Sequence, residues 1–279
     1  MRDTMILRVS KFARLYRADC LQDMNLNLNR VQSHWFEAFK FLSSKMLAQG
    51  RPDKTTKKIR QMVENTVTEH LDCSTSDGIV NAELKQIVDA KETFRNMRVK
   101  GLSYKKQNDI DMLFGADIRS RNYNTQGLLR YIASLPKGNI VVHSIDEISS
   151  GRLIPHYRKL TSFYGVGPIA VATYLRDLID LYFDQLGKNV TTIQEYAHIQ
   201  PVDACVKRVA TEVGIEFDYE TPIAQGQKIV EACTVVGNSN RLPIEFSQGA
   251  SWICTNAFEA ALRLLDDKGL ENDLTKKFE

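Results

Sequence analysis

The sequence predicts an all-α protein, and three features carry that prediction. Apolar residues recur mostly three and four positions apart, which is the period of a helix. Long alternating runs of β-branched residues, the usual mark of strands, are missing. Ser, Gly, Asp and Asn gather in short interruptions at 73–79, 115–122 and 136–152, which predict the longer loops. We therefore expect one compact unit made of two helical lobes.

The expected helices follow in order from their cap residues and their apolar period. Asn29 is suited to begin a long helical run that stops at Gly50, since glycine accepts the left-handed angles of a C-terminal cap. Asp53 and Asn81 are suited to begin the next two helices. Further helices are expected near 105–114, 123–134, 153–163, 168–186, 191–198, 203–213, 222–236 and 243–266. One candidate strand, NIVVHSI at 139–145, is too isolated to make a sheet.

Composition describes an ordinary globular protein. With 279 residues, 43% of them hydrophobic and 25% charged, the chain can bury a full core without disulfides or metals. No apolar run is long enough to span a bilayer, and the N-terminus lacks the apolar core of a signal peptide. We expect an intracellular monomer with no membrane partner.

The cysteines argue against a metal site. They are odd in number, widely spaced and without a C-x-x-C pair, at Cys20, Cys73, Cys205, Cys233 and Cys254. This pattern disfavours a disulfide framework, a zinc site or an iron–sulfur cluster, and favours reduced cysteines that pack as small hydrophobes.

Charge is distributed unevenly along the chain. The net charge is +3, but residues 1–60 hold 13 Lys and Arg against 5 Asp and Glu, so they carry +8 and the remainder −5. A basic segment suits phosphate contacts, yet on charge alone a solvated helix face is the favoured interpretation.

A pair of glycines interrupts an apolar, helix-like run at 160–176, LTSFYGVGPIAVATYLR. Gly165 and Gly167 permit a sharp reversal, and Pro168 suits the first position of a second helix. The N–H groups at the start of that helix would form an anion site. By itself a G-x-G pair more often marks only a tight turn. The surrounding stretch 151–176 contains no Asp or Glu but four basic residues, Arg152, Arg158, Lys159 and Arg176.

Together with a second segment, the hairpin resembles a known family. Phe163-Tyr164-Gly165-Val166-Gly167 and the later Pro201-Val202-Asp203 are similar to the signature of the helix-hairpin-helix DNA glycosylases, the HhH-GPD superfamily. Stretches 121–136 and 242–258 resemble the helix before the hairpin and the closing helix of that family. The resemblance divides the chain into unmatched N-terminal helices, 1–120, and a glycosylase-like region, 121–270, with its hairpin at 155–181.

The resemblance implies a fold, an activity and a set of contacts. Two helical lobes would flank an active cleft, with Asp203 as the catalytic carboxylate. A monovalent cation would bind to the carbonyls of Tyr164 and Val166, and no iron–sulfur cluster is implied, since its cysteines are missing. The DNA contacts expected are Gly165, Val166, Gly167, Arg158 and Lys159. The candidates for the base pocket are Tyr164, Tyr123, Gln126, Gln248 and Trp252. The sequence does not distinguish among them.

The expected reaction also favours such a carboxylate, without reference to the family. Cleavage of an N-glycosidic bond builds positive charge on the sugar, which a fixed anion stabilises, and the same group can activate the attacking water. Asp203 also precedes an apolar helical run, so it could serve simply as a helix N-cap, and the two roles can coexist.

Two departures from the family pattern refine the prediction. Bifunctional members carry a nucleophilic lysine two positions after the second hairpin glycine, where this chain has Ile169, so a water-using glycosylase without lyase activity is expected. Gly167 and Asp203 lie 36 positions apart, which is longer than in compact members. Among the histidines, only His156, beside Arg158 and Lys159, has a reason to lie near DNA.

The leading hypothesis is a base-excision repair hydrolase that removes a damaged or mispaired base from duplex DNA. The alternative is a non-catalytic helix-hairpin-helix DNA-binding protein in which Asp203 only caps a helix. A third hypothesis makes the hairpin a plain corner in an unrelated helical protein, without DNA affinity.

Overall fold

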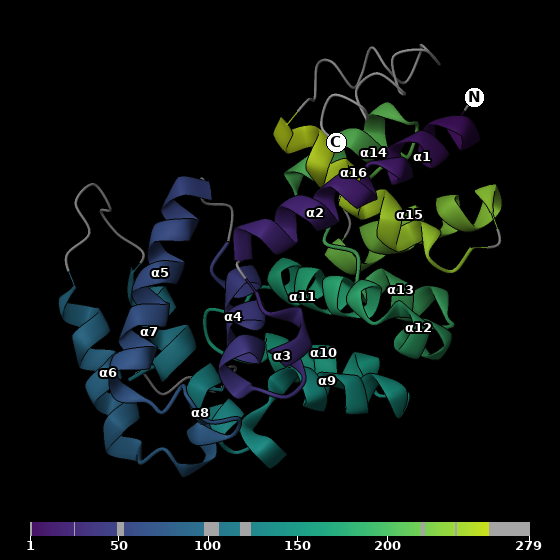
Figure 1. Cartoon of the computed structure of the whole chain (residues 1–279). Coiled ribbons are helices and arrows are strands. Elements are labelled where there is room, and N and C mark those ends of the chain that lie inside the picture. Colours follow the sequence, from purple (N-terminus) through teal and green to yellow (C-terminus); the bar gives the residue numbers. More distant parts are fainter. Residues whose placement is uncertain are drawn as a thin grey trace. The chain divides into compact units, whose positions relative to one another are not determined.

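The computed structural model describes residues 2–24, 26–48, 53–97, 106–117, 124–218, 221–237 and 239–256. In these ranges the regular elements are helices, and β-structure is limited to one isolated bridge between Asn124 and Phe163. The expected all-α fold class is therefore confirmed (Figure 1). Among the described helices, none combines the length and apolar character that crossing a membrane requires.

The chain forms two compact units. Unit 1 comprises Met1–Asn25 and Leu175–Glu279, and unit 2 comprises Leu26–Tyr174. The boundary between the units lies within helix α11, Pro168–Leu181. The basic segment 1–60 is consequently shared between the two units and does not belong to one of them.

Unit 2 is built from the helices that follow one another through the first half of the chain. Its elements are α3 (Leu28–Val31), α4 (Trp35–Met46), α5 (Asp53–His70), η1 (Gly78–Asn81), α6 (Leu84–Asn96), α7 (Lys106–Phe114), α8 (Leu128–Ala133), η2 (Pro136–Gly138), α9 (Ile140–Ser149), α10 (Leu153–Thr161) and the start of α11. The aromatic residues Trp35, Phe39 and Phe41 of α4 are buried, so this run is core and not a base-stacking surface.

Unit 1 joins the two ends of the described chain. Its elements are α1 (Arg2–Lys11), α2 (Ala13–Met24), the rest of α11, α12 (Phe183–Leu186), η3 (Gly187–Asn189), α13 (Ile193–His198), α14 (Ala204–Glu212), α15 (Pro222–Val236) and α16 (Leu242–Asn256). Helix α1, in purple, packs along α16, in yellow (Figure 1). Gly249 permits this close approach, because a side chain there would collide with the carbonyl of Val9. Phe12, Val209 and Phe246 belong to the same core.

Several local expectations are wrong. Residues 139–145 open helix α9 instead of a strand or loop, because Asn139 Oδ1 accepts the N–H groups of Val141 and Val142 at 2.9 and 3.0 Å and so caps the helix. The run after Asn29 breaks into α3 and α4, and α4 begins after His34. The N-cap of α6 is Glu83 and not Asn81, which ends η1. The expected cap at Gly50 lies outside the described residues.

Candidate functional site

The turn between α10 and α11 carries the predicted hairpin, and backbone contacts hold it. Phe163 is fully buried and forms the isolated bridge with Asn124. Asn124 N donates to Ser162 O at 2.7 Å, and Tyr164 N donates to Asn124 O at 3.1 Å. Val166 N donates to Phe163 O at 3.1 Å. The turn is thus anchored within unit 2 by main-chain bonds on its inner side.

The two hairpin glycines stand in different surroundings. Gly165 has a φ of +78°, and a Cβ there would lie 3.0 Å from Asn108 O and 3.2 Å from Met112 Cβ, so the conformation and the packing against α7 both demand glycine. Gly167 has no left-handed φ, and a Cβ there would meet nothing within 4 Å. The fold therefore explains Gly165 but gives no steric reason for glycine at 167.

The four basic residues around the hairpin separate into different roles. Arg158 and Lys159 are exposed, and Lys159 Nζ lies 5.3 and 5.5 Å from the ring centroids of Tyr131 and Phe163. Arg152 pairs with Glu147, Nη2 to Oε1 at 2.8 Å. Arg176 is fully buried, so it does not contribute to a basic surface.

Tyr164 and Val166 flank Gly165 and were expected to hold a cation through their carbonyls. The Val166 side chain is buried, and that of Tyr164 is half-buried. Backbone carbonyls are the donors that a monovalent cation takes, so the donor chemistry fits such an ion. The amide of Val166, however, is engaged in the turn, which makes it a poor contact for a DNA phosphate.

His156 is not near the surface of the hairpin, which corrects its expected place near DNA. It is 2% exposed, and Ser144 Oγ lies 2.8 Å from its Nε2 and 3.0 Å from the hydroxyl of Tyr174. The ring of His143 lies 5.3 Å away, edge-on. Burial, and next the proximity of His143, lowers the pKa of His156 to about 4. The cluster is therefore a neutral part of the interior at pH 7.

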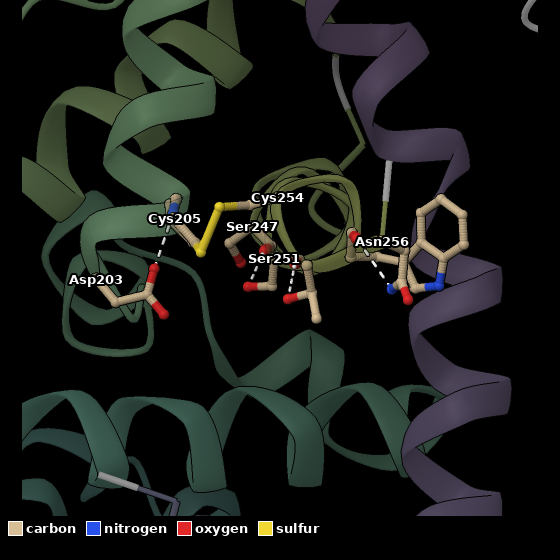
Figure 2. The surroundings of a disulfide bond; sticks show 9 residues. Asp203, Cys205, Ser247, Ser251, Cys254 and Asn256 are labelled. Carbon is tan, nitrogen blue, oxygen red and sulfur yellow. Dashed lines mark hydrogen bonds between the residues drawn. A yellow bond between two sulfur atoms is a disulfide. The ribbon is translucent and has the colours of Figure 1, made fainter. Parts of the chain in front are cut away.

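Asp203 is the N-cap of helix α14 in unit 1. Its Oδ1 accepts the N–H of Val206 at 2.8 Å, and the side chain is half-buried (Figure 2). Among the described residues, no partner occurs for the second carboxylate oxygen. The cap thus fixes the carboxyl group in place and leaves one oxygen able to accept a further hydrogen bond.

Two of the expected base-pocket residues belong to the core of unit 1. Trp252 is 4% exposed, its Nε1 donates to Asp19 Oδ2 at 2.8 Å, and its ring stacks on Phe12. Gln248 is 1% exposed, and its Nε2 donates to Asp180 Oδ2 at 3.0 Å. Both side chains are thus buried in unit 1, although Gln248 Oε1 has no hydrogen-bond partner among the described residues.

The other pocket candidates come from the segment before α8 and from the hairpin. Gln126 is half-buried, and its N–H donates to Asn124 Oδ1 at 2.9 Å. Gln126 and Tyr164 both neighbour Asn124 in unit 2. Tyr123 lies outside the described residues.

The sequence analysis does not predict a buried charge network in unit 1. Arg176 Nε donates to Asp177 Oδ1 at 2.8 Å, and its Nη2 donates to Tyr16 OH at 2.6 Å. Asp180 accepts from Arg17 and, at 2.8 Å, from Arg241. The sequence signal for this network was the three charged residues at 176, 177 and 180 in an otherwise apolar helix. Charged side chains on a buried helix need partners, so they indicate a charge network.

The cysteine prediction is wrong for one pair. Cys205 and Cys254 form a disulfide, with Cα atoms 5.4 Å apart, while Cys20, Cys73 and Cys233 are thiols. The fold brings together two residues 49 positions apart, a proximity that their spacing in the sequence does not reveal.

A surface cavity of about 510 Å³ occurs in unit 1, and none of the predicted site residues lines it. It is bounded by Arg2, Asp3, Gly214, Ile215, Glu216, Lys228, Glu231, Ala232 and Val235.

Comparison of the chain with family models, with curated proteins and with solved structures finds no match.

Proposed function

We propose that this protein is a monofunctional DNA glycosylase that hydrolyses the N-glycosidic bond of a damaged or mispaired base. The observation that carries the proposal is the state of Asp203. One carboxylate oxygen is held by the Val206 amide, and the described residues offer the other no partner. A general base must be held in position and still have a lone pair to use, and this carboxylate meets both conditions.

In the proposed reaction Asp203 accepts a proton from the attacking water and stabilises the positive charge that develops on the sugar. The target base must first leave the duplex stack, at a cost of a few kcal/mol that contacts with the protein would offset. Ile169, which is 38% exposed, cannot form an imine with the sugar, so the reaction ends with base release and not with strand cleavage.

The hairpin supplies the proposed grip on the DNA backbone. Gly167 has no packing reason to be glycine, and a missing side chain lets a phosphate approach the N–H groups at the start of α11. Arg158 is exposed on the preceding helix and adds positive charge. The carbonyls of Tyr164 and Val166 would hold a monovalent cation, which supplies positive charge near a bound phosphate.

The test is a base-release assay on duplexes that carry 8-oxoguanine, alkylated purines, uracil or a thymine mismatch. Release from at least one duplex is expected, with strand breaks only after alkali treatment. Asp203→Asn keeps a side-chain oxygen for the cap and removes the charge, so folding should persist while release falls by about 10²–10³-fold. Asp203→Ala should lose the cap as well, at about 1 kcal/mol of stability.

The matched control is Glu212→Gln, which removes one exposed negative charge from the same helix and should release base at the wild-type rate. Absence of base release from every duplex, or undiminished release by Asp203→Asn, contradicts the proposal. Salt-dependent duplex binding without release would instead favour the non-catalytic DNA-binding alternative.

A further inference from the structure

The disulfide links the helix that Asp203 caps to a second helix of unit 1. Cys205 stands in the first turn of α14, two positions after Asp203, and Cys254 stands in the last turn of α16 (Figure 2). The Val206 amide, which donates to the Asp203 carboxylate, directly follows Cys205 in the chain. The covalent link therefore acts on the same helical turn that fixes the proposed catalytic carboxylate.

Packing brings the two cysteines together whether or not they are bonded. Val206 and Val209 of α14 and Ala250 and Ile253 of α16 are buried in one hydrophobic core. The Cα separation of 5.4 Å is the usual spacing of a disulfide. Two thiols that the surrounding core holds this close re-form their disulfide readily, because the two helices are already packed together.

Both cysteines are half-buried and are not enclosed in the core. In contrast, Cys233 is buried and stays a thiol, with its pKa raised to about 12 by burial. The paired cysteines are therefore less enclosed than Cys233, and a small thiol needs only a limited opening to reach them.

We propose that Cys205 and Cys254 form a reversible thiol–disulfide site that tightens or loosens the turn carrying Asp203. In the oxidised state the bond holds the start of α14 to α16. In the reduced state the non-covalent core still joins the helices, but their ends open more often. The co-reactants are low-molecular-weight thiols and disulfides such as glutathione.

Reduction of the disulfide takes two steps. A glutathione thiolate attacks one sulfur atom of the pair, the protein S–S bond breaks, and the other cysteine leaves as a thiolate. A second glutathione thiolate attacks the glutathione sulfur of the mixed disulfide and releases the first cysteine, so two glutathione molecules are oxidised to one disulfide and the protein gains two thiols. Oxidation by glutathione disulfide reverses both steps.

The experiment places the full-length chain in glutathione buffers that range from fully reduced to fully oxidised. Alkylation and mass spectrometry report the thiol state, and hydrogen exchange reports the amides of residues 205–207. The pair should change from thiol to disulfide across the series, and exchange at these amides should be roughly tenfold or more faster in the reduced protein.

Variants separate the bond from general effects of reduction. Cys254→Ser should show the fast exchange in every buffer, and Cys205→Ser should behave alike. Cys73→Ser, at a thiol that is also half-buried but lies in unit 2, should respond to the buffers as the wild type does. If a serine variant fails to fold, the reduced wild-type chain supplies the same state.

The proposal is overturned if the pair stays oxidised or stays reduced across the whole series, or if exchange at 205–207 is the same in both states. These readouts need no base release, so they decide the redox proposal even where the glycosylase proposal fails.

Discussion

The hairpin turn has an inner side, which packs against other parts of unit 2, and an outer side, which is exposed. The residues on these two sides are under different structural constraints. On the inner side, Gly165 packs against α7 with a left-handed φ, and His156 is buried in a polar cluster. On the outer side, Gly167 faces open space, and Arg158 and Ile169 are exposed. Residues that look equally important in the sequence therefore divide into those required by the fold and those that the fold leaves unexplained.

This difference matters because only substitutions on the outer side can test ligand binding directly. A change on the inner side alters stability, and any loss of binding that follows is indirect. A change on the outer side leaves the fold intact, so its effect on binding is direct. Three predictions test this division, from the largest effect on stability to the smallest.

Gly165→Ala should lower the free energy of unfolding by about 2–3 kcal/mol, because alanine tolerates the φ of +78° poorly and its Cβ crowds Asn108 O at 3.0 Å. Denaturant unfolding at pH 7 measures the change. Gly237→Ala is the control, since glycine there has an extended backbone and a new Cβ would meet only Leu242 at 3.8 Å. Equal stability of the two variants would contradict the proposed constraint on the inner side.

Lowering the pH from 7 to 5 should cost roughly 2 kcal/mol of stability through His156. Its pKa is about 4 in the fold against an ordinary 6.5, so the unfolded chain takes up the proton first as pH falls, and stability is lost between these values. Burial lowers the pKa of His143 as well, which acts in the same direction.

The measurement is denaturant unfolding at pH 7 and pH 5 for the wild type and for His156→Gln. The variant should show a smaller dependence on pH than the wild type. An unchanged pH dependence in His156→Gln would show that another group is responsible.

Gly167→Ala should leave stability unchanged or raise it by up to about 1 kcal/mol, since the added methyl meets no atom and restricts the unfolded chain. If a phosphate approaches this turn, duplex affinity should fall roughly tenfold in the same variant. Fluorescence anisotropy with a labelled duplex at low salt measures the affinity. The Gly237→Ala chain should bind as the wild type, and equal binding by both variants would remove the outer side from the DNA contact.

Much of the helical architecture was predictable because helix signals are local. The expected runs at 153–163, 168–186 and 203–213 correspond to α10, to α11 with α12, and to α14, and Asp203 has the cap position that its place before an apolar run predicts. The error at 139–145 has both a local and a tertiary cause. The β-branched run at 139–145 favours a strand, but the Asn139 cap and the tertiary surroundings decide for a helix.

The candidate site was less predictable, because burial depends on distant parts of the chain. Gln248 and Trp252 have the chemistry of pocket residues, yet their partners, Asp180 and Asp19, are contributed by other helices. The His156 cluster likewise depends on Ser144 and Tyr174 from elsewhere in unit 2. No pattern confined to one helix reveals such partners.

The sequence by itself determined the helical class, most helix positions and the location of a glycine turn and a capping aspartate, because propensity and capping act over a few residues. Only the tertiary structure decided that Gly165 is a packing glycine while Gly167 is not, and that Cys205 meets Cys254. These outcomes depend on contacts between segments tens of residues apart, and such contacts form only when hydrophobic burial has brought the helices together.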